Sequence, residues 1–416
     1  MSFDIAKAAQ LAKQSKGAIA NLNPQNRLKL LQTIASELIA NSEAIITENQ
    51  KDLALAKETG LSASMVDRLG LDQKGIEAIA SAVLNIAAQP DVLGSIENMH
   101  ALPSGIEVGK MRIPLGVIAM IYESRPNVTI DAAVLCLKAG NAVILRGGKE
   151  AQYSNQALAN VLHDALNKCG LPSDIVTVIP TPDREVMNTM LTLSQDIDLV
   201  IPRGGEGLIR HVTQHSQIPV IQHFKGVCHL FVEASADEQK ALAILENGKT
   251  QRTGVCNALE TLLVDTSIAD SFLPKVAELF KNKQVKVHAC EQSQAYFDDA
   301  ELATEDDWHA EYLALEIAVK LVDGFDKAVE HITQYGSGHT EVIVTEQHGL
   351  AQRFLREVNS SVVMVNASSR FSDGGELGLG AEIGISTSKL HAYGPMGAQS
   401  LTTQKFIVMG DGHVRS

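Results

Sequence analysis

The chain has 416 residues, of which 45% are apolar and 20% charged, and a formal net charge of −14. This length exceeds one ordinary core, so two domains are expected. The negative charge disfavours nucleic acid and anionic membranes as main partners, although a local arginine cluster can still bind an anionic substrate. The N-terminus has no signal-peptide pattern and no apolar run reaches membrane-spanning length. The five cysteines are scattered and lack CxxC spacing, which predicts reduced thiols in a cytoplasm and no metal site.

The first part of the chain, to about residue 89, carries apolar residues at helical spacing. Helices are expected at 4–20, 24–40, 42–59 and 72–89. Between residues 91 and 114 the sequence changes to short extended pieces broken by prolines and glycines. Residues 106–108 and 110–113 are expected to pair as a hairpin that projects from the body. An oligomer contact and a plain surface hairpin are both consistent with this pattern.

Residues 115 to 232 alternate apolar strands with amphipathic helices, which predicts βαβ units and a parallel sheet buried on both faces. Ligands of such sheets bind beyond the carboxyl ends of the strands. A second α/β unit follows, and the extended tail from Tyr393 to Val408 is expected to pair with the hairpin. The informative residues of the first unit are those that follow its strands, at 123–127, 146–149, 180–182 and 203–207.

Two Arg-Gly-Gly turns, at 146–148 and 203–205, each open a predicted helix. Glycine lets the backbone approach a phosphate, the helix N-terminus favours its charge, and arginine supplies a bidentate donor. Two such turns on one sheet favour a dinucleotide. Neither turn is a GxGxxG fingerprint or a Walker loop, and a purely conformational role for the glycines is equally consistent.

Cys256 lies in the stretch 250–258, directly ahead of the predicted strand 261–264. A thiol at this position can be held rigidly and still be reached by a substrate, as a nucleophile must be. Arg252 and the backbone N–H groups of the turn would favour the thiolate. The alternative is an inert core cysteine, which is the common fate of a free thiol.

Several longer stretches resemble one known family. They lie at 122–129, 145–148, 254–257, 311–313, 322–332, 335–341 and 365–371. Their order is similar to the aldehyde dehydrogenase superfamily, and their details resemble its gamma-glutamyl phosphate reductase family over essentially the whole chain.

The resemblance implies a fold of two parallel-sheet α/β domains that face each other across a cleft, with a small oligomerisation hairpin. It implies a cofactor-binding domain at 1–230 with a hairpin at about 98–114, and a catalytic domain at 231–365 that carries Cys256. Residues 366–392 would return to the cleft and the cofactor domain, and the tail 393–416 would pair with the hairpin. A homo-oligomer, dimer or tetramer, is expected.

The resemblance also implies roles for single residues. Cys256 is expected to be the nucleophile, and the amide of Asn127 with the backbone N–H of Cys256 is expected to form an oxyanion hole. Glu311 is expected at the nicotinamide ribose. The remaining cofactor residues are expected to be Arg146, Gly147, Gly148 and Lys149 at the adenosine ribose and Arg203, Gly204 and Gly205 at a second phosphate turn. Arginine and lysine at the ribose suit the 2′-phosphate of NADP, so NADPH is the expected cofactor.

The implied reaction is the reduction of gamma-glutamyl phosphate to glutamate 5-semialdehyde through a cysteine thioester, the second step of proline biosynthesis. The anionic substrate needs cations, and Arg125, Arg252 and Arg370 are candidates, with structural salt bridges as the alternative. His223 falls near the position where hydrolysing relatives carry a glutamate base, which fits a thioester that is not hydrolysed.

Two other functions stay open. One is a related enzyme that oxidises a free aldehyde, and the other is a non-catalytic paralogue. Because the acyl phosphate is labile and must come from a separate glutamate 5-kinase, transient association with that kinase is a further hypothesis.

Overall fold

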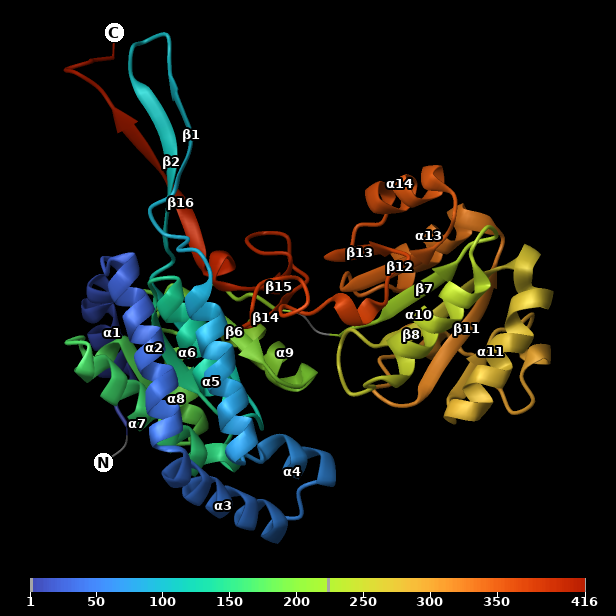
Figure 1. The fold of residues 1–416 in the computed structure, drawn as a ribbon, viewed down its shortest axis with the longest axis horizontal. Coiled ribbons are helices and arrows are strands. Elements are labelled where there is room, and N and C mark those ends of the chain that lie inside the picture. Colours follow the sequence, from blue (N-terminus) through green and yellow to red (C-terminus); the bar gives the residue numbers. More distant parts are fainter. Residues whose placement is uncertain (1–2, 223–224, 416) are drawn as a thin grey trace. The chain divides into compact units, whose positions relative to one another are not determined.

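A computed structural model describes residues 3–222 and 225–415. The chain divides into two compact units (Figure 1). Unit 1 comprises Met1–Gln222, Gly378–Gly384 and Met396–Ser416, and unit 2 comprises His223–Leu377 and Ile385–Pro395. The boundary between the two domains is predicted after residue 230, whereas the first segment of unit 1 ends at Gln222, ahead of the first strand of unit 2, Cys228–Val232. No helix in the described ranges is both long and apolar enough to cross a membrane.

The sheet of unit 1 is parallel and runs in the order β5-β4-β3-β6. Its strands are β3 (Val117–Tyr122), β4 (Ala142–Arg146), β5 (Val176–Val178) and β6 (Leu199–Arg203). Every residue of β3 is buried, as the continuous apolar run predicts. The strand order reverses between β3 and β6, and the carboxyl ends at such a switch point are the usual ligand site.

The helices of unit 1 cover both faces of this sheet. They are α1 (Ile5–Ala20), α2 (Pro24–Ala40), α3 (Ser42–Glu58), α4 (Ala63–Leu69), α5 (Gln73–Ala88), α6 (Asn127–Lys138), α7 (Gln152–Lys168), α8 (Arg184–Met190) and α9 (Glu206–His215). Helices α6 and α7 pack together, and right-handed crossovers place α8, which contacts α1, on the opposite face. Asp4, Asn23 and Asp72 cap the helices that follow them, which explains where those helices begin.

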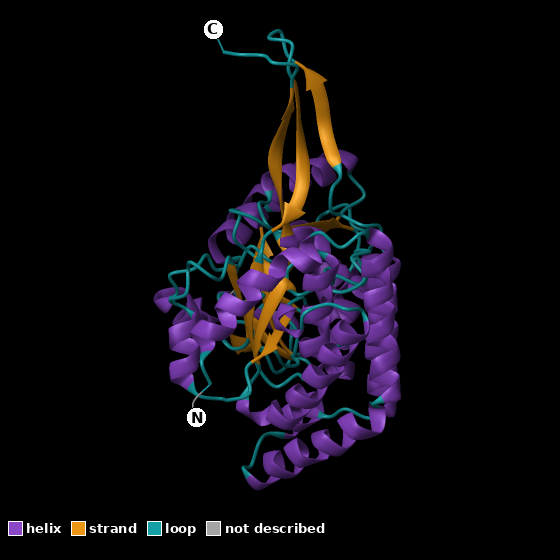
Figure 2. Cartoon of the chain, turned by 90° about the vertical axis from the view of Figure 1, so that its left-hand side faces the viewer, coloured by secondary structure: helices purple, strands orange, loops and turns teal. Residues whose placement is uncertain are grey.

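An arm of three antiparallel strands belongs to unit 1 (Figure 2). It consists of β1 (Ile96–Ala101), β2 (Glu107–Pro114) and β16 (Thr402–Met409), with β2 in the centre. The predicted pairing of 106–108 with 110–113 is wrong, because 107–114 form one continuous strand. Gly109 makes no turn there. A Cβ on Gly109 would lie 2.7 Å from Met99 Sδ, so the glycine leaves room for that side chain on β1.

The sheet of unit 2 is parallel and runs in the order β10-β9-β11-β8-β7-β12-β13. Its strands are β7 (Cys228–Val232), β8 (Leu259–Asp265), β9 (Lys286–Ala289), β10 (Glu301–Leu302), β11 (Glu316–Val322), β12 (Thr340–Val344) and β13 (Val362–Val365). Its helices are α10 (Glu238–Thr250), α11 (Ala269–Lys283), α12 (Glu305–Trp308), α13 (Gly324–Tyr335) and α14 (His348–Glu357). The central strands β7, β8 and β12 are buried throughout. A short ladder of β14 (Gly384–Ser386) and β15 (Gly394–Met396) completes the fold.

Candidate active site

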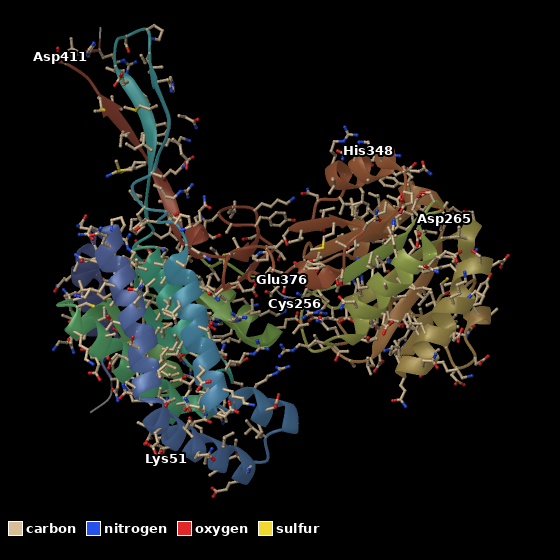
Figure 3. The ribbon with its side chains drawn as sticks, in the orientation of Figure 1. Lys51, Cys256, Asp265, His348, Glu376 and Asp411 are labelled. Atoms are coloured by element: carbon tan, nitrogen blue, oxygen red, sulfur yellow. The ribbon has the colours of Figure 1, made fainter. Side chains whose placement is uncertain are left out.

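Cys256 lies on the loop that leads from α10 into β8 and is half-buried (Figure 3). In this parallel sheet the loops that precede neighbouring strands meet at one edge, the amino end. The candidate nucleophile of unit 2 is therefore at the amino end of its sheet, whereas the predicted ligand turns of unit 1 follow the carboxyl ends of their strands.

Hydrogen bonds join the loops that precede β7, β11 and β12 at this edge. The backbone N–H of Gly226 donates to Glu311 Oε1 at 2.9 Å, and that of Val227 donates to Ser337 Oγ at 2.9 Å. A Cβ on Gly226 would lie 2.0 Å from the backbone oxygen of Cys256, so the two loops are in direct contact. Glu311 and Cys256, which are far apart in the sequence, are thus tied to the same short segment.

Hydrogen bonds from neighbouring segments fix the backbone around Cys256. The side-chain amide of Asn257 donates to the backbone oxygen of Ser372 at 2.9 Å, and Ser369 Oγ donates to the backbone oxygen of Asn257 at 2.7 Å. The buried thiol of Cys228 donates to the backbone oxygen of Cys256 at 3.2 Å. Burial raises the pKa of the Cys228 thiol well above its ordinary value, so this sulfur stays protonated and remains a donor.

Two of the three predicted substrate arginines lie close to Cys256. Burial lowers the pKa of Arg370 and the charge of Arg252 lowers it further, while Asp373 and, less strongly, Cys256 oppose the shift. Arg370 therefore lies within electrostatic reach of both Arg252 and Cys256. Arg370 Nε donates to Gln251 Oε1 at 2.8 Å, which orients the guanidinium. The third, Arg125, belongs to unit 1, on the turn between β3 and α6.

A buried ion pair lies behind the segment that carries Glu311. Lys249 Nζ donates to Glu260 Oε2 at 2.7 Å, and both side chains are completely buried. Glu260 Oε1 accepts from the backbone N–H of Leu313 at 3.4 Å, and Lys249 Nζ lies 6.0 Å from the ring centroid of Tyr312. Burial raises the pKa of Glu260 to about 7, although Lys249 opposes the shift. The pair braces the two residues that follow Glu311.

The turn after β3 carries Asn127, the first residue of α6. Its side-chain Nδ2 donates to Asp131 Oδ2 at 2.9 Å, one helical turn further on. Burial raises the pKa of Asp131, and the charge of Arg203 opposes that shift. Ser124, at φ +49°, is fixed in the same turn because its Oγ donates to Glu150 Oε1 at 2.8 Å.

The first Arg-Gly-Gly turn borders a small hollow beyond β4 and β5. Gly147, Gly148, Lys149, Thr181 and Pro182 are among its lining residues. Arg146 Nη2 donates to the backbone oxygen of Pro182 at 2.9 Å, and burial lowers the pKa of Arg146. Arg146 Nε is buried and makes no hydrogen bond within the described part of the chain.

The second turn already holds a negative charge of the protein itself. The backbone N–H of Gly205, at the start of α9, donates to Glu123 Oε2 at 3.0 Å. A Cβ on Gly204 would lie 2.3 Å from the same oxygen, and one on Gly148 would lie 2.1 Å from Glu150 Oε1. Gly148 and Gly205 have φ near −65°, so left-handed backbone explains neither; the close carboxylate explains Gly148, whereas a Cβ on Gly205 would meet open space.

Arg203 is turned toward its own unit. Its Nη1 donates to the backbone oxygens of Glu382 and Ile383 at 3.4 and 3.3 Å, and its Nη2 lies 3.9 Å from Glu382 Oε1. The side chain anchors the segment 378–384 to β6, a contact that the turn motif did not predict.

Sequence reasoning also missed Gly226, Cys228, Asp131, Glu123 and the Lys249–Glu260 pair. Asp131 contacts a residue one helical turn away, but the roles of the others depend on contacts between segments that are separated in the sequence, which no local pattern reports. His223 lies outside the described residues. In the described ranges, no three His, Cys, Asp or Glu side chains gather as a metal site requires.

Known proteins match this chain over its whole length. The model of the aldehyde dehydrogenase family matches residues 2–295, and the chain belongs to that family. It is 57% identical to the gamma-glutamyl phosphate reductase of Colwellia psychrerythraea over 99% of both chains, and 57% identical to that of Idiomarina loihiensis over 100% of both. The crystal structure of the gamma-glutamyl phosphate reductase of Thermotoga maritima is 41% identical, with a TM-score of 0.97 and full coverage of both chains. Within the aldehyde dehydrogenase family the chain therefore groups with the gamma-glutamyl phosphate reductases, which confirms the predicted family and fold class.

Proposed function

We propose that this protein reduces gamma-glutamyl phosphate to glutamate 5-semialdehyde and phosphate with NADPH, as the second step of proline biosynthesis from glutamate. The observation that carries the proposal is the half-buried Cys256, held on a braced loop with Arg252 and Arg370 in electrostatic reach. The full-length similarity to gamma-glutamyl phosphate reductases supports the choice of substrate.

In the first half of the reaction the Cys256 thiolate attacks the acyl carbon of the substrate. A carbon–sulfur bond forms, the bond from carbon to the phosphate oxygen breaks, and phosphate leaves with the electron pair. Arg252 and Arg370 bind the anionic groups of the substrate, with Arg125 as the third candidate. The attack turns the carbonyl oxygen of the substrate into an oxyanion. The backbone N–H of Cys256 and the amide of Asn127 donate to it, and one such donor contributes about 10²- to 10³-fold in rate.

The residues of unit 1 fit a dinucleotide cofactor. The buried Nε of Arg146 is a donor without a partner in the described chain, and Arg184 adds a second positive charge near it. With Lys149 at the hollow, these cations favour the 2′-phosphate of NADPH over the hydroxyl of NADH. Gly147 and Gly148 line the same hollow. The Arg203-Gly204-Gly205 turn would bind the pyrophosphate of the cofactor, and Glu311 would bind its nicotinamide ribose. NADPH supplies a hydride when bound.

In the second half, Cys256 would hold the acyl group as a thioester whose carbon accepts the hydride, and the product of that transfer would be a thiohemiacetal on the same sulfur. Its oxyanion, held by the same two donors, collapses to the aldehyde and expels the thiolate, which restores the enzyme. No step in this sequence uses water, so the site requires no carboxylate base to activate it.

The reverse reaction tests the proposal. The protein is mixed with NADP and glutamate 5-semialdehyde in equilibrium with pyrroline-5-carboxylate, with and without inorganic phosphate, and NADPH formation is followed. We expect turnover that requires phosphate and disappears in Cys256→Ala. Turnover that is indifferent to phosphate would make water the acceptor and refute the proposal.

The arm supports a proposal about assembly. Ile96, Phe406, Val408 and Met409 expose half or more of their surfaces on its strands, which favours burial against another subunit. We propose a homo-oligomer, a dimer or tetramer, built through the arm. Light scattering that reports a monomer at micromolar concentration would contradict this.

Two further partner and location proposals follow from the chemistry. The acyl phosphate is labile, so transient association with a glutamate 5-kinase would protect it, and co-sedimentation of the two proteins tests this.

A cytoplasmic location is consistent with cysteines that form no disulfide among the described residues. Fractionation of cells would check it.

A further inference from the structure

The side chain of Asn127 is held by a neighbour whose role the proposed mechanism leaves open. Asn127 and Asp131 lie one turn apart on α6, and Nδ2 of Asn127 donates to Asp131 Oδ2 at 2.9 Å. A primary amide has two N–H donors. The bond to Asp131 uses one of them and fixes the rotation of the amide plane, which sets the direction of the other.

We propose that Asp131 is a positioning residue that aims the second N–H of Asn127 at the substrate oxyanion. This inference rests on the proposed function, in which Asn127 is an oxyanion donor. A donor aimed in advance costs no reorganisation when charge develops, whereas a displacement of about 1 Å can cost about 10²-fold in rate.

The surroundings of Asp131 argue against an incidental contact. The residue as a whole is half-buried, but its carboxyl lies deep enough that burial raises its pKa, and Arg203 opposes this shift. A buried carboxylate is unfavourable unless hydrogen bonds or opposite charges compensate it. Here the compensation comes from the Asn127 amide and from Arg203, which is itself anchored to the backbone of Glu382 and Ile383.

The charge of Asp131 cannot be its contribution to rate. A carboxylate next to an oxyanion repels it, so the electrostatic effect opposes catalysis and only the geometric effect supports it. An asparagine at 131 offers a carbonyl acceptor in the same place without the charge. A glutamate keeps the charge but moves the acceptor by one methylene. The two substitutions therefore separate position from charge.

The test uses the full chain in the phosphate-dependent reverse assay with Asp131→Asn, Asp131→Glu, Asp131→Leu, Asn127→Ala and the double variant Asn127→Ala/Asp131→Leu. We expect Asp131→Asn to keep kcat within about threefold of the parent, and Asp131→Glu and Asp131→Leu to lose about 10- to 100-fold in kcat with KM for NADP little changed. The double variant should be no slower than Asn127→Ala alone, because the two residues act as one unit.

A matched control comes from Asp52, a buried carboxylate of the same unit that accepts from the backbone N–H and Oγ of Ser154, on α7 and not on α6. Asp52→Leu should lower thermal stability, and its effect on kcat, if any, should multiply with that of Asn127→Ala. If Asp131→Leu does not fold, Asp131→Asn and Asp131→Glu still decide the question.

The two proposals fail differently. If Asn127→Ala keeps full kcat, the oxyanion role of Asn127 is refuted and the inference falls with it. If Asn127→Ala is slow but Asp131→Glu is fast, or the losses of Asn127→Ala and Asp131→Leu multiply, the inference on Asp131 is refuted while the oxyanion role stands.

Discussion

The stability of unit 2 should depend on the charge of one buried lysine. Lys249 Nζ donates to Glu260 Oε2 and to the backbone oxygen of Leu259 at 2.7 and 2.8 Å, and both charged side chains are fully buried. Lys249→Met keeps the length of the side chain but leaves the carboxylate without its partner. Breaking a buried pair in this way costs about 3–5 kcal/mol, and the stranded carbonyl adds about 1 kcal/mol. We expect the free energy of unfolding to fall by about 4–6 kcal/mol.

Removing both charges should restore most of this loss. In Lys249→Met/Glu260→Leu the pair is replaced by apolar groups of similar volume, and the unfolding free energy should return to within about 2 kcal/mol of the parent. The matched control is Lys327→Met, because the Lys327–Glu330 pair lies in the same unit with both side chains more than half exposed. Because solvent screens this pair, its loss should leave the unfolding transition at the same urea concentration as in the parent.

Tryptophan emission provides the measurement. The single tryptophan of the chain, Trp308, is buried in unit 2, so its emission during urea denaturation follows the unfolding of that unit. A loss below about 1 kcal/mol in Lys249→Met, or a double variant as unstable as the single one, would refute the reasoning about the pair.

Three more outcomes are expected. Burial raises the pKa of Glu260 from 4.5 to about 7 in the folded state, so the folded state binds a proton at this carboxyl more tightly than the unfolded state does. The stabilisation from this proton is complete below pH 4.5 and is lost as the pH rises to about 7. Relative to Glu260→Gln, the unfolding free energy of the parent should fall by about 3 kcal/mol over that range in urea titrations. Gly226→Ala places a Cβ 2.0 Å from the backbone oxygen of Cys256 and should lower kcat at least about 10²-fold, whereas Gly349→Ala, which meets open space, should not. Glu123→Gln removes the carboxylate from the Gly205 N–H and should lower KM for NADP by about two- to fivefold at low salt; an unchanged KM would show that the cofactor does not use this N–H.

Much of the architecture could be predicted because periodicity and capping act locally. The continuous apolar runs predicted the buried strands of unit 1, and apolar periodicity predicted the helices that Asp4, Asn23 and Asp72 cap in the structure. Helix α4 was missed because it has only seven residues and no long apolar stripe. The turn of the hairpin was misplaced because glycine commonly signals a turn, whereas Gly109 lies within β2 and leaves room for the side chain of Met99 on β1.

The candidate site could be predicted only in part. A cysteine ahead of a strand is visible in the sequence, and the resemblance pointed to its role. The carboxylates of Glu123, Glu150 and Asp131 were not foreseen, because each finds its hydrogen-bond donor through a side-chain rotamer that the sequence does not specify. The Gly-rich turns were attributed to phosphate approach or backbone freedom, and the structure adds close contact with these acidic side chains as a third reason.

The arm joins segments that are far apart in the sequence, which imposes an order on its folding during synthesis. Strand β2 can pair with β1 early, but its other edge waits for β16, which is translated much later. At typical synthesis rates that edge is open for roughly 15 to 60 s, long enough to invite pairing with another nascent chain. Lys110 keeps an exposed charged side chain on this waiting strand, a feature that disfavours pairing with another edge until β16 covers it.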